Sequence, residues 1–276
     1  MSKPLNREDV IKNKKRGINY INNLLEGYIS KNDYLKKANL ISYWLKDYAN
    51  MLRFEESFDP KKNIRYTRGD IVKVNFGFRV GSEFGGLHYA VIFDKHNERN
   101  SPVVTVIPLT SNNEDGSKLK GANVDIGDEL YQKLKLKRNT LVKNINYEIS
   151  SAEKNLSTFF KLKEIVSGTS SETITIEAST PLNIDVEDMK SKLDDVITSN
   201  KSKIEAMRKK NGFLEKIGRE VSKMKTGSVA LSNQITTISK IRIQDPKTSA
   251  GVLAGIRLSE ESMELINERI KDFYIF

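Results

Sequence analysis

Apolar positions recur at intervals of three and four residues between residues 5 and 56. They fall into two series: Ile18, Ile21, Leu24, Leu25, Tyr28 and Ile29, then Leu35, Ala38, Ile41, Trp44, Leu45, Tyr48 and Leu52. This spacing puts apolar side chains on one helix face and predicts a helical hairpin. The break falls at residues 30–33, where Asn32 or Asp33 is the candidate cap of the second helix. The apolar stripe must be buried, either against the rest of the chain, which we favour, or against a partner.

Strand patterns begin near Tyr66 and return at Ser228. The expected strands are 71–74, 89–93 and 103–108, with 122–126 as one more. Clusters of Gly, Asn and Pro bound them, as is typical of strands joined by turns. Several short strands in succession indicate a small barrel rather than a sheet of alternating strands and helices.

A helical period occupies residues 127 to about 224, with a second, shorter one in residues 258–276. Residues 167–181 are rich in Ser and Thr and interrupt the long stretch, and their core ETITIEA is either a short strand or an extended linker. The second half of the stretch is loosened near Gly212. Two long helices with a break between them predict an antiparallel hairpin. Ser259 is the candidate N-cap of the last helix.

These patterns predict an α+β fold. A small SH3-like β-barrel with a C-terminal helix is interrupted by a long helical hairpin and preceded by a helical hairpin. The expected domains are residues 1–60, residues 61–126 together with 225–276, and residues 127–224.

The charge balance favours a polyanionic partner, because Lys and Arg release counterions when they contact phosphates. The 276 residues include 46 Lys and Arg against 36 Asp and Glu, a formal charge of +10. The alternative is an ordinary solvated surface. Cysteine is absent, and His88 and His96 are the two histidines, so thiol chemistry is excluded and no metal-binding motif is present. No apolar run is long enough for a membrane span, and MSKPLNREDV has no signal-peptide core, so we expect a cytoplasmic protein.

Four fragments carry a resemblance. In order, they are Arg68-Gly69-Asp70, residues 81–89 (GSEFGGLHY), residues 108–111 (PLTS) and residues 228–237 (SVALSNQITT). With the helix that follows, they resemble the PemK/MazF-type toxins of type II toxin-antitoxin systems. The resemblance covers residues 65–126 and 225–276.

The resemblance implies a metal-independent endoribonuclease, bacterial or phage-encoded, that cuts single-stranded RNA. It also implies a homodimer and an acidic antitoxin. In such enzymes a base takes the proton of the ribose 2′-OH, which attacks the adjacent phosphorus, and an acid protonates the leaving 5′-oxygen. A loop arginine and a strand-end threonine stabilise the charge of the transition state. Thr110 matches the threonine, whereas His88 stands at the arginine position.

His88 is therefore the point at which this chain departs from the family. A histidine acts as general acid or base near neutral pH, but it lacks the charged bidentate fork of arginine. Arg79, in the same loop, is the candidate for the missing charge, and Glu83 for orienting His88 or Arg79. The alternatives are that His88 only satisfies a local hydrogen bond in an inactive site and that Glu83 is a plain surface residue. His96, in the turn DKHNERNSP, is expected to be exposed.

Further residues are candidates for binding RNA. They are Lys73, Phe78, Phe84, Gly85, Gly86, Lys95, Ser111 and Gln234. The lysines and Arg79 would contact phosphates, and the two glycines would allow a close backbone approach. The phenylalanines are either stacking platforms for bases or part of the barrel core.

The helical segments leave several interpretations open. Three interpretations of their Lys/Arg-rich stretches stay open: they bind RNA, they dock an antitoxin, or they are ordinary solvated helix faces. The insert is also a candidate dimerisation element. The N-terminal extension could cover the site within the same chain. Our first hypothesis for function is an RNA-cleaving toxin that inhibits translation. The alternative is a non-catalytic barrel that binds a protein, RNA or DNA partner, as gyrase poisons of this fold do.

Overall fold

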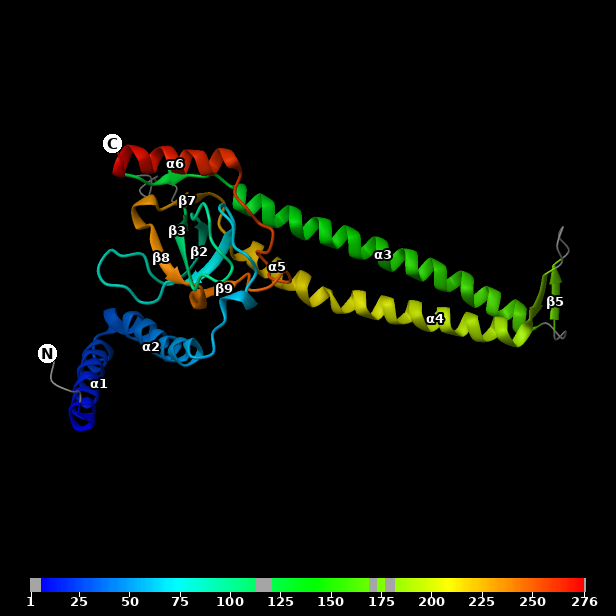
Figure 1. The fold of residues 1–276 in the computed structure, drawn as a ribbon, viewed down its shortest axis with the longest axis horizontal. Coiled ribbons are helices and arrows are strands. Elements are labelled where there is room, and N and C mark those ends of the chain that lie inside the picture. Colours follow the sequence, from blue (N-terminus) through cyan, green and yellow to red (C-terminus); the bar gives the residue numbers. More distant parts are fainter. Residues whose placement is uncertain (1–5, 113–120, 169–172, 177–181, 276) are drawn as a thin grey trace. The chain divides into compact units, whose positions relative to one another are not determined.

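Two segments that lie far apart in the sequence build one sheet (Figure 1). The computed structural model describes residues 6–112, 121–168, 173–176 and 182–275. The strands are β1 (Ile71–Asn75), β2 (Leu87–Ile92), β3 (Val103–Ser111), β4 (Val124–Asp125), β7 (Ser228–Ala230), β8 (Thr236–Ser239) and β9 (Ile243–Asp245). Their order in the sheet is β4-β7-β3-β2-β1-β9, and β8 pairs with β3. The four strands expected from residues 71–126 are confirmed, with bounds that differ by at most three residues.

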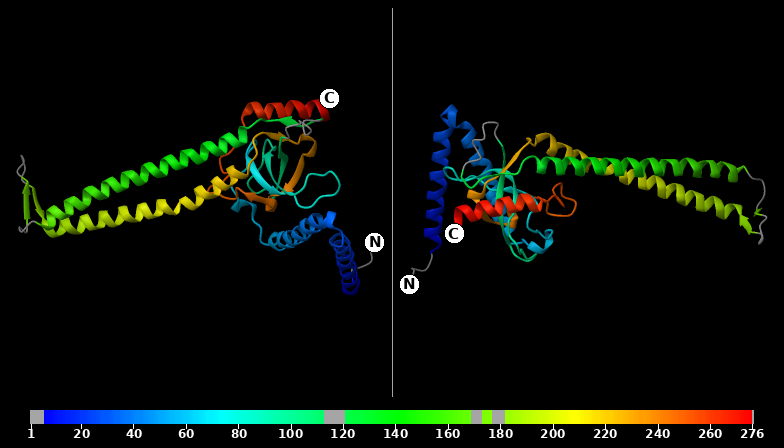
Figure 2. Two further views of the ribbon diagram at one scale, coloured as in Figure 1. Left: turned by 180° about the vertical axis from the view of Figure 1, so that it is seen from behind. Right: turned by 90° about the horizontal axis from the view of Figure 1, so that it is seen from above.

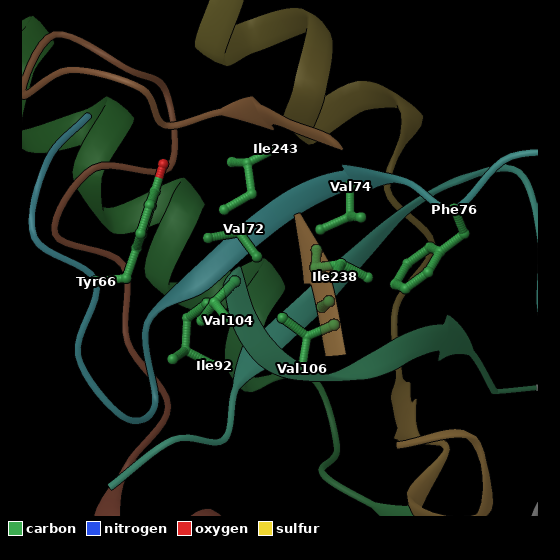
Figure 3. Packing of buried hydrophobic residues seen from close by; sticks show 10 residues of the cluster. Tyr66, Val72, Val74, Phe76, Ile92, Val104, Val106, Ile238 and Ile243 are labelled. Atoms are coloured by element: carbon green, nitrogen blue, oxygen red, sulfur yellow. The ribbon is translucent and has the colours of Figure 1, made fainter. Parts of the chain in front are cut away.

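One face of this sheet carries a buried apolar cluster (Figure 3). Its members are Tyr66, Val72, Val74, Phe76, Ala90, Ile92, Val104, Val106, Ile238 and Ile243. In the antiparallel register Val72 pairs with Ala90, and Ile92 pairs with Val106. Residues directly opposite one another place their side chains on the same face, so these pairs form successive layers of the core.

The C-terminal helix α6 (Glu260–Tyr274) begins as the sequence predicts. The Ser259 hydroxyl accepts the backbone N–H of Ser262 at 3.2 Å. Glu260 and Glu261 follow in the first turn, where negative charge is favourable. The side chain of Arg68 ties this helix to the sheet by donating to Asn267 Oδ1 and to the Phe93 carbonyl.

The N-terminal hairpin consists of α1 (Arg7–Ile29) and α2 (Leu35–Glu55), joined through the 3-10 helix η1 (Asn32–Tyr34). The expected cap is wrong, because Asn32 and Asp33 lie inside η1, and Tyr34 precedes α2 without a side-chain capping bond. The chain enters α2 already coiled, so no extended residue occupies the cap position. Helix α2 buries Ala38 and Ile41, whereas α1 has no buried residue.

Contacts divide the chain into two compact units, residues 1–124 with 229–276, and residues 125–228. The second unit contains the antiparallel helices α3 (Glu129–Ser167) and α4 (Val186–Lys209), which run side by side in both views of Figure 2. In the connection from α3 to α4, strands β5 (Thr173–Ile176) and β6 (Leu182–Asp185) pair with each other, and α5 (Asn211–Lys223) follows α4.

The strand interpretation of ETITIEA is thereby confirmed for residues 173–176, while residues 169–172 and 177–181 lie outside the described part. The break near Gly212 is confirmed between α4 and α5. The division into three domains stays a prediction. No helix among the described residues is long and apolar enough to cross a membrane.

Candidate active site

His88 and Thr110 lie two residues beyond the last paired residues of β2 and β3. His88 on β2 pairs with Val74 on β1, and Ala90 pairs with Pro108 on β3. Continuing the β2–β3 register by two residues puts Thr110 across from His88, on the face that carries the core cluster. Both residues are half-buried, whereas Val74 is fully buried. His88 and Thr110 therefore lie where the apolar core gives way to solvent.

Two phenylalanine rings connect the core to His88. Phe76 is 1% exposed and lies at the opposite end of the labelled cluster from Tyr66 (Figure 3). The Phe84 ring meets Phe76 edge to face, with centroids 5.8 Å apart. The Phe84 and His88 rings are 4.4 Å apart and tilted. Phe84 thus packs partly against the core, and its ring holds the imidazole in place from one side.

The loop between β1 and β2 is closed at its root by backbone hydrogen bonds. The N–H of Phe76 donates to Gly86, and the N–H of Gly86 donates to Gly77, each at 2.8 Å. Gly86 has φ +91°, which glycine adopts without strain. A Cβ at Gly85 would lie 2.7 Å from the Gly77 carbonyl oxygen. The expected need for two glycines here has a structural reason: the two arms of the loop touch through their backbones.

Two guanidinium groups converge on a single carbonyl at this root. Arg79 Nε donates to the Phe76 oxygen at 3.1 Å, and Arg242 Nη1 donates to the same oxygen at 3.2 Å. Burial lowers the pKa of Arg242, and the positive charge of Arg79 lowers it further. Glu83 Oε2 lies 3.9 Å from Arg79 Nη1 and is largely exposed, so it neutralises this charge weakly. The result is a concentration of positive charge at the Phe76 carbonyl.

Helix α2 of the N-terminal hairpin covers the same root. The Trp44 ring lies under Gly77 and 5.2 Å from the Arg242 guanidinium carbon. The Asn75 side chain donates to Asp47 Oδ2 at 3.1 Å and accepts the N–H of Gly77 at 3.0 Å. Part of the expected apolar stripe is therefore buried against the chain itself.

Gln234 reaches the loop from the later segment of the chain. It ends the 3-10 helix η3 (Ser232–Gln234), and its Oε1 accepts the N–H of Phe84 at 3.2 Å. This bond ties the loop to the later segment of the chain. Gln234 thus holds the residue whose ring contacts His88.

The remaining candidates are more widely spread. Lys73 pairs with Tyr89 and lies 5.5 Å from its ring, on the face of β1 opposite to Val72 and Val74. Lys95 follows the far end of β2 from His88 and is exposed. Phe78 is half-buried in the loop. Ser111 follows Thr110 on β3, so strand alternation directs it to the other face. His96 is exposed, as expected.

Sequence reasoning did not identify the roles of Trp44, Asn75 and Arg242. Trp44 belonged to a recognised apolar stripe, but its partners are far away in the chain. Arg242 follows the last of the four motif fragments, where a basic residue by itself gives no sign of its partners. The one signal available was the position of Asn75 directly after the strand 71–74, at the start of the glycine-rich loop.

The side chains around His88 and Thr110 do not form an evident metal site. Among the described residues, no three His, Asp or Glu side chains are placed to hold a metal ion together.

Comparison with known proteins adds one finding. No curated protein matches the chain. Residues 67–148 match the family model described as PemK-like, MazF-like toxin of type II toxin-antitoxin systems. That range contains β1–β4, the glycine-rich loop, His88 and Thr110, and it ends within α3. The chain therefore contains a PemK/MazF-like toxin domain.

Proposed function

We propose that this protein is an endoribonuclease that cleaves single-stranded RNA, with His88 and Thr110 as its reacting pair. The observation that supports the proposal is the β2–β3 register, which, continued two residues past Ala90 and Pro108, would set His88 and Thr110 opposite one another at the open end of the core. The toxin-domain match supports it, since both residues lie within the matched range.

His88 supplies the proton chemistry in this proposal. The neutral imidazole takes the proton of the ribose 2′-OH, a task suited to a group that titrates near neutral pH. The 2′-oxygen then bonds to phosphorus while the bond to the 5′-oxygen breaks, and the leaving oxygen receives a proton from solvent. The products are a cyclic phosphate and a 5′-hydroxyl, and no metal ion takes part.

Thr110 and Arg79 stabilise the charge that develops on the phosphate oxygens. Positioned donors of this kind are usually the largest single contribution to such a reaction. The Thr110 hydroxyl donates from β3, and the partly exposed Arg79 donates from the loop. Arg242 binds the same carbonyl as Arg79 and adds positive charge at the root of the loop that leads to His88.

The biological setting follows from the same proposal. Cleavage of messenger RNA in the cytoplasm would stop translation, and the formal charge of +10 suits an RNA substrate and an acidic antitoxin. Homodimer formation, RNA contacts by Lys73 and Lys95, and docking of the antitoxin on the helical segments belong to this proposal as well.

The test is incubation of the protein with a long single-stranded RNA in EDTA. Three proteins are compared: wild type, His88→Ala and the matched control His96→Ala, which changes an exposed turn residue. We expect cleavage by wild type and by His96→Ala, and none by His88→Ala. Equal cleavage by all three variants would remove His88 from the mechanism.

A non-catalytic partner-binding module is the second candidate. One observation favours it: the His88 ring packs against Phe84 at 4.4 Å, as a structural histidine would. Intact RNA after incubation with excess wild-type protein, together with measurable binding of that RNA or of a protein partner, would support this candidate over the nuclease.

A further inference from the structure

A cavity of about 330 Å³ lies between α2 and the rim of the sheet. Helix α2 contributes Asn50 and Phe54, the start of β2 contributes Leu87, and the segment around β9 contributes Gln244 and Lys247. The volume falls in the range of small-ligand sites, about 300–1,000 Å³. All of these residues belong to the same compact unit.

The lining has the chemistry of a site for a nucleobase. Phe54 and Leu87 are 49% and 52% exposed, so large apolar surfaces face solvent at the cavity. Asn50 and Gln244 each present an amide with both donors and an acceptor, and Lys247 presents a positive charge. Single-stranded RNA is recognised in this way, by stacking on aromatic rings and hydrogen bonds to base edges.

The cavity wall adjoins the proposed active site. Asn75 pairs with Leu87 on the pair of strands where Val74 pairs with His88, so the cavity and His88 lie on neighbouring rungs. Consecutive strand residues are separated by about 3.3 Å along the strand and point to opposite faces. A chain passing over the rim of β2 therefore meets Leu87 on one side and His88 on the other.

The wall is also held in a fixed position. Asn75 is bonded to Asp47 on α2 and to the backbone of Gly77 at the loop root. These two bonds link the helix, the strand and the catalytic loop, so the cavity keeps its shape before a ligand arrives. A preformed site loses less conformational entropy when it binds.

We propose that this cavity receives one base of the RNA chain, that of the nucleotide beside the phosphate at His88. The inference rests on the proposed nuclease function. Phe54 and Leu87 contact the faces of the base, Asn50 and Gln244 bond its edge, and Lys247 contacts a backbone phosphate. The N-terminal hairpin, which lies outside the family match, thereby contributes to the sequence preference of the enzyme.

The first test measures binding without cleavage. Fluorescently labelled hexanucleotides with 2′-O-methyl groups cannot be cut, and a set of them varies one base at a time. We expect wild type to prefer one base at one position at least tenfold in Kd. Asn50→Ala and Gln244→Ala should lose this preference, whereas Asn22→Ala, the same change at an exposed position on α1, should keep it. Melting temperatures confirm that each variant is folded.

The second test maps the cut sites in a randomised RNA pool with the same four proteins. The expected result is weaker base preference at one position beside the cut in Asn50→Ala and Gln244→Ala, with preferences elsewhere unchanged. Equal binding of all hexanucleotides by wild type, or unchanged preferences in both variants, overturns the inference. Base-selective binding that depends on Asn50 and Gln244, without any cleavage, would instead overturn the nuclease and leave the base site standing.

Discussion

The indole ring of Trp44 lies so close to Gly77 that a Cβ on this glycine would be 2.6 Å from it. Trp44 is the only tryptophan of the chain. The ring also neighbours Arg242, whose guanidinium binds the carbonyls of Asn75 and Phe76. One side chain from α2 thus links the root of the loop between β1 and β2 to the segment that follows β8.

We expect Gly77→Ala to destabilise the protein far more than Gly81→Ala. Both glycines have positive φ, +82° and +60°, so each substitution carries a backbone cost of about 1 kcal/mol. Gly81 has open space around it, whereas Gly77 meets Trp44. The steric conflict should add about 1–3 kcal/mol to the free energy lost by Gly77→Ala, measured by urea unfolding.

The contact itself is tested by a double variant. If Trp44 causes the extra loss, combining Trp44→Ala with Gly77→Ala should cost less than the sum of the two single variants. Additive losses would show that the conflict is not with Trp44.

Thr110→Val should abolish most RNA cleavage. Valine keeps the shape of threonine and suits a strand, but it removes the hydroxyl that donates to the phosphate in the proposed mechanism. Loss of one such donor lowers the rate constant on the order of 10² to 10³. The control is Thr105→Val on the same strand, where the hydroxyl bonds to Thr237 at 3.2 Å and lies away from the site. Similar cleavage rates for both variants would contradict the role of Thr110.

Gln234→Ala should reduce cleavage by loosening the loop. The Phe84 N–H would lose its acceptor, and the ring that holds His88 would become less ordered. Gln234→Glu keeps an oxygen at the same place and should retain most of the activity. We expect the difference to appear in kcat more than in KM, because the loop positions a reacting group. A loss of equal size in both variants would point to an amide contact with RNA instead.

Tyr66→Phe should alter the pH dependence of stability. Burial raises the pKa of Tyr66 above its ordinary value, so the folded state favours the neutral phenol. Its contribution is fully present below the unfolded pKa of about 10 and is lost as the pH rises above it, by up to about 1.4 kcal/mol per pH unit. Urea unfolding between pH 7 and 11 should therefore show a steeper loss for wild type than for Tyr66→Phe.

The same variant has a second, pH-independent effect. The Tyr66 hydroxyl donates to the Pro246 carbonyl at 2.8 Å, so its removal should cost about 1 kcal/mol at pH 7. Lys240 lies near the Tyr66 ring, and burial lowers its pKa, but it is present in both proteins and does not affect the comparison of slopes. Tyr20→Phe, at an exposed tyrosine of α1, should behave like wild type. A slope unchanged by Tyr66→Phe would contradict the prediction.

The helices and the first strands could be predicted from the sequence because their signals are local. The spacing of apolar residues predicted α2, α3 and α4, and Ser259, a typical N-cap residue, predicted the start of α6. The face of the sheet on which Lys73 lies was also predictable, since its neighbours Val72 and Val74 are apolar and the side chains of a strand alternate between the two faces. The prediction that Lys73 contacts RNA together with Arg79 did not use this alternation.

The arrangement of the candidate site could not be predicted in the same way. Whether His88 lies across from Thr110 depends on the register between β2 and β3, and that register cannot be read from the sequence of either strand alone. The contacts of Trp44 with Arg242 and of Gln234 with Phe84 join residues more than a hundred positions apart. Such pairs form only when the fold brings distant segments together, and one sequence carries no local mark of them.

The strands of the sheet come from two segments of the chain that residues 125–228 separate, and this has a consequence during synthesis on the ribosome. The nascent chain presents β1–β3, with His88 and Thr110, before residues 125–228 are made, and only then β8, β9, Gln234 and Arg242. At about 5–20 residues per second, the delay is roughly 5–20 s. During that time the edges of β1 and β3 lack their later partners, and the loop of His88 lacks its support. His88 and Thr110 are therefore synthesised well before Gln234 and Arg242, the residues that bond the loop between β1 and β2.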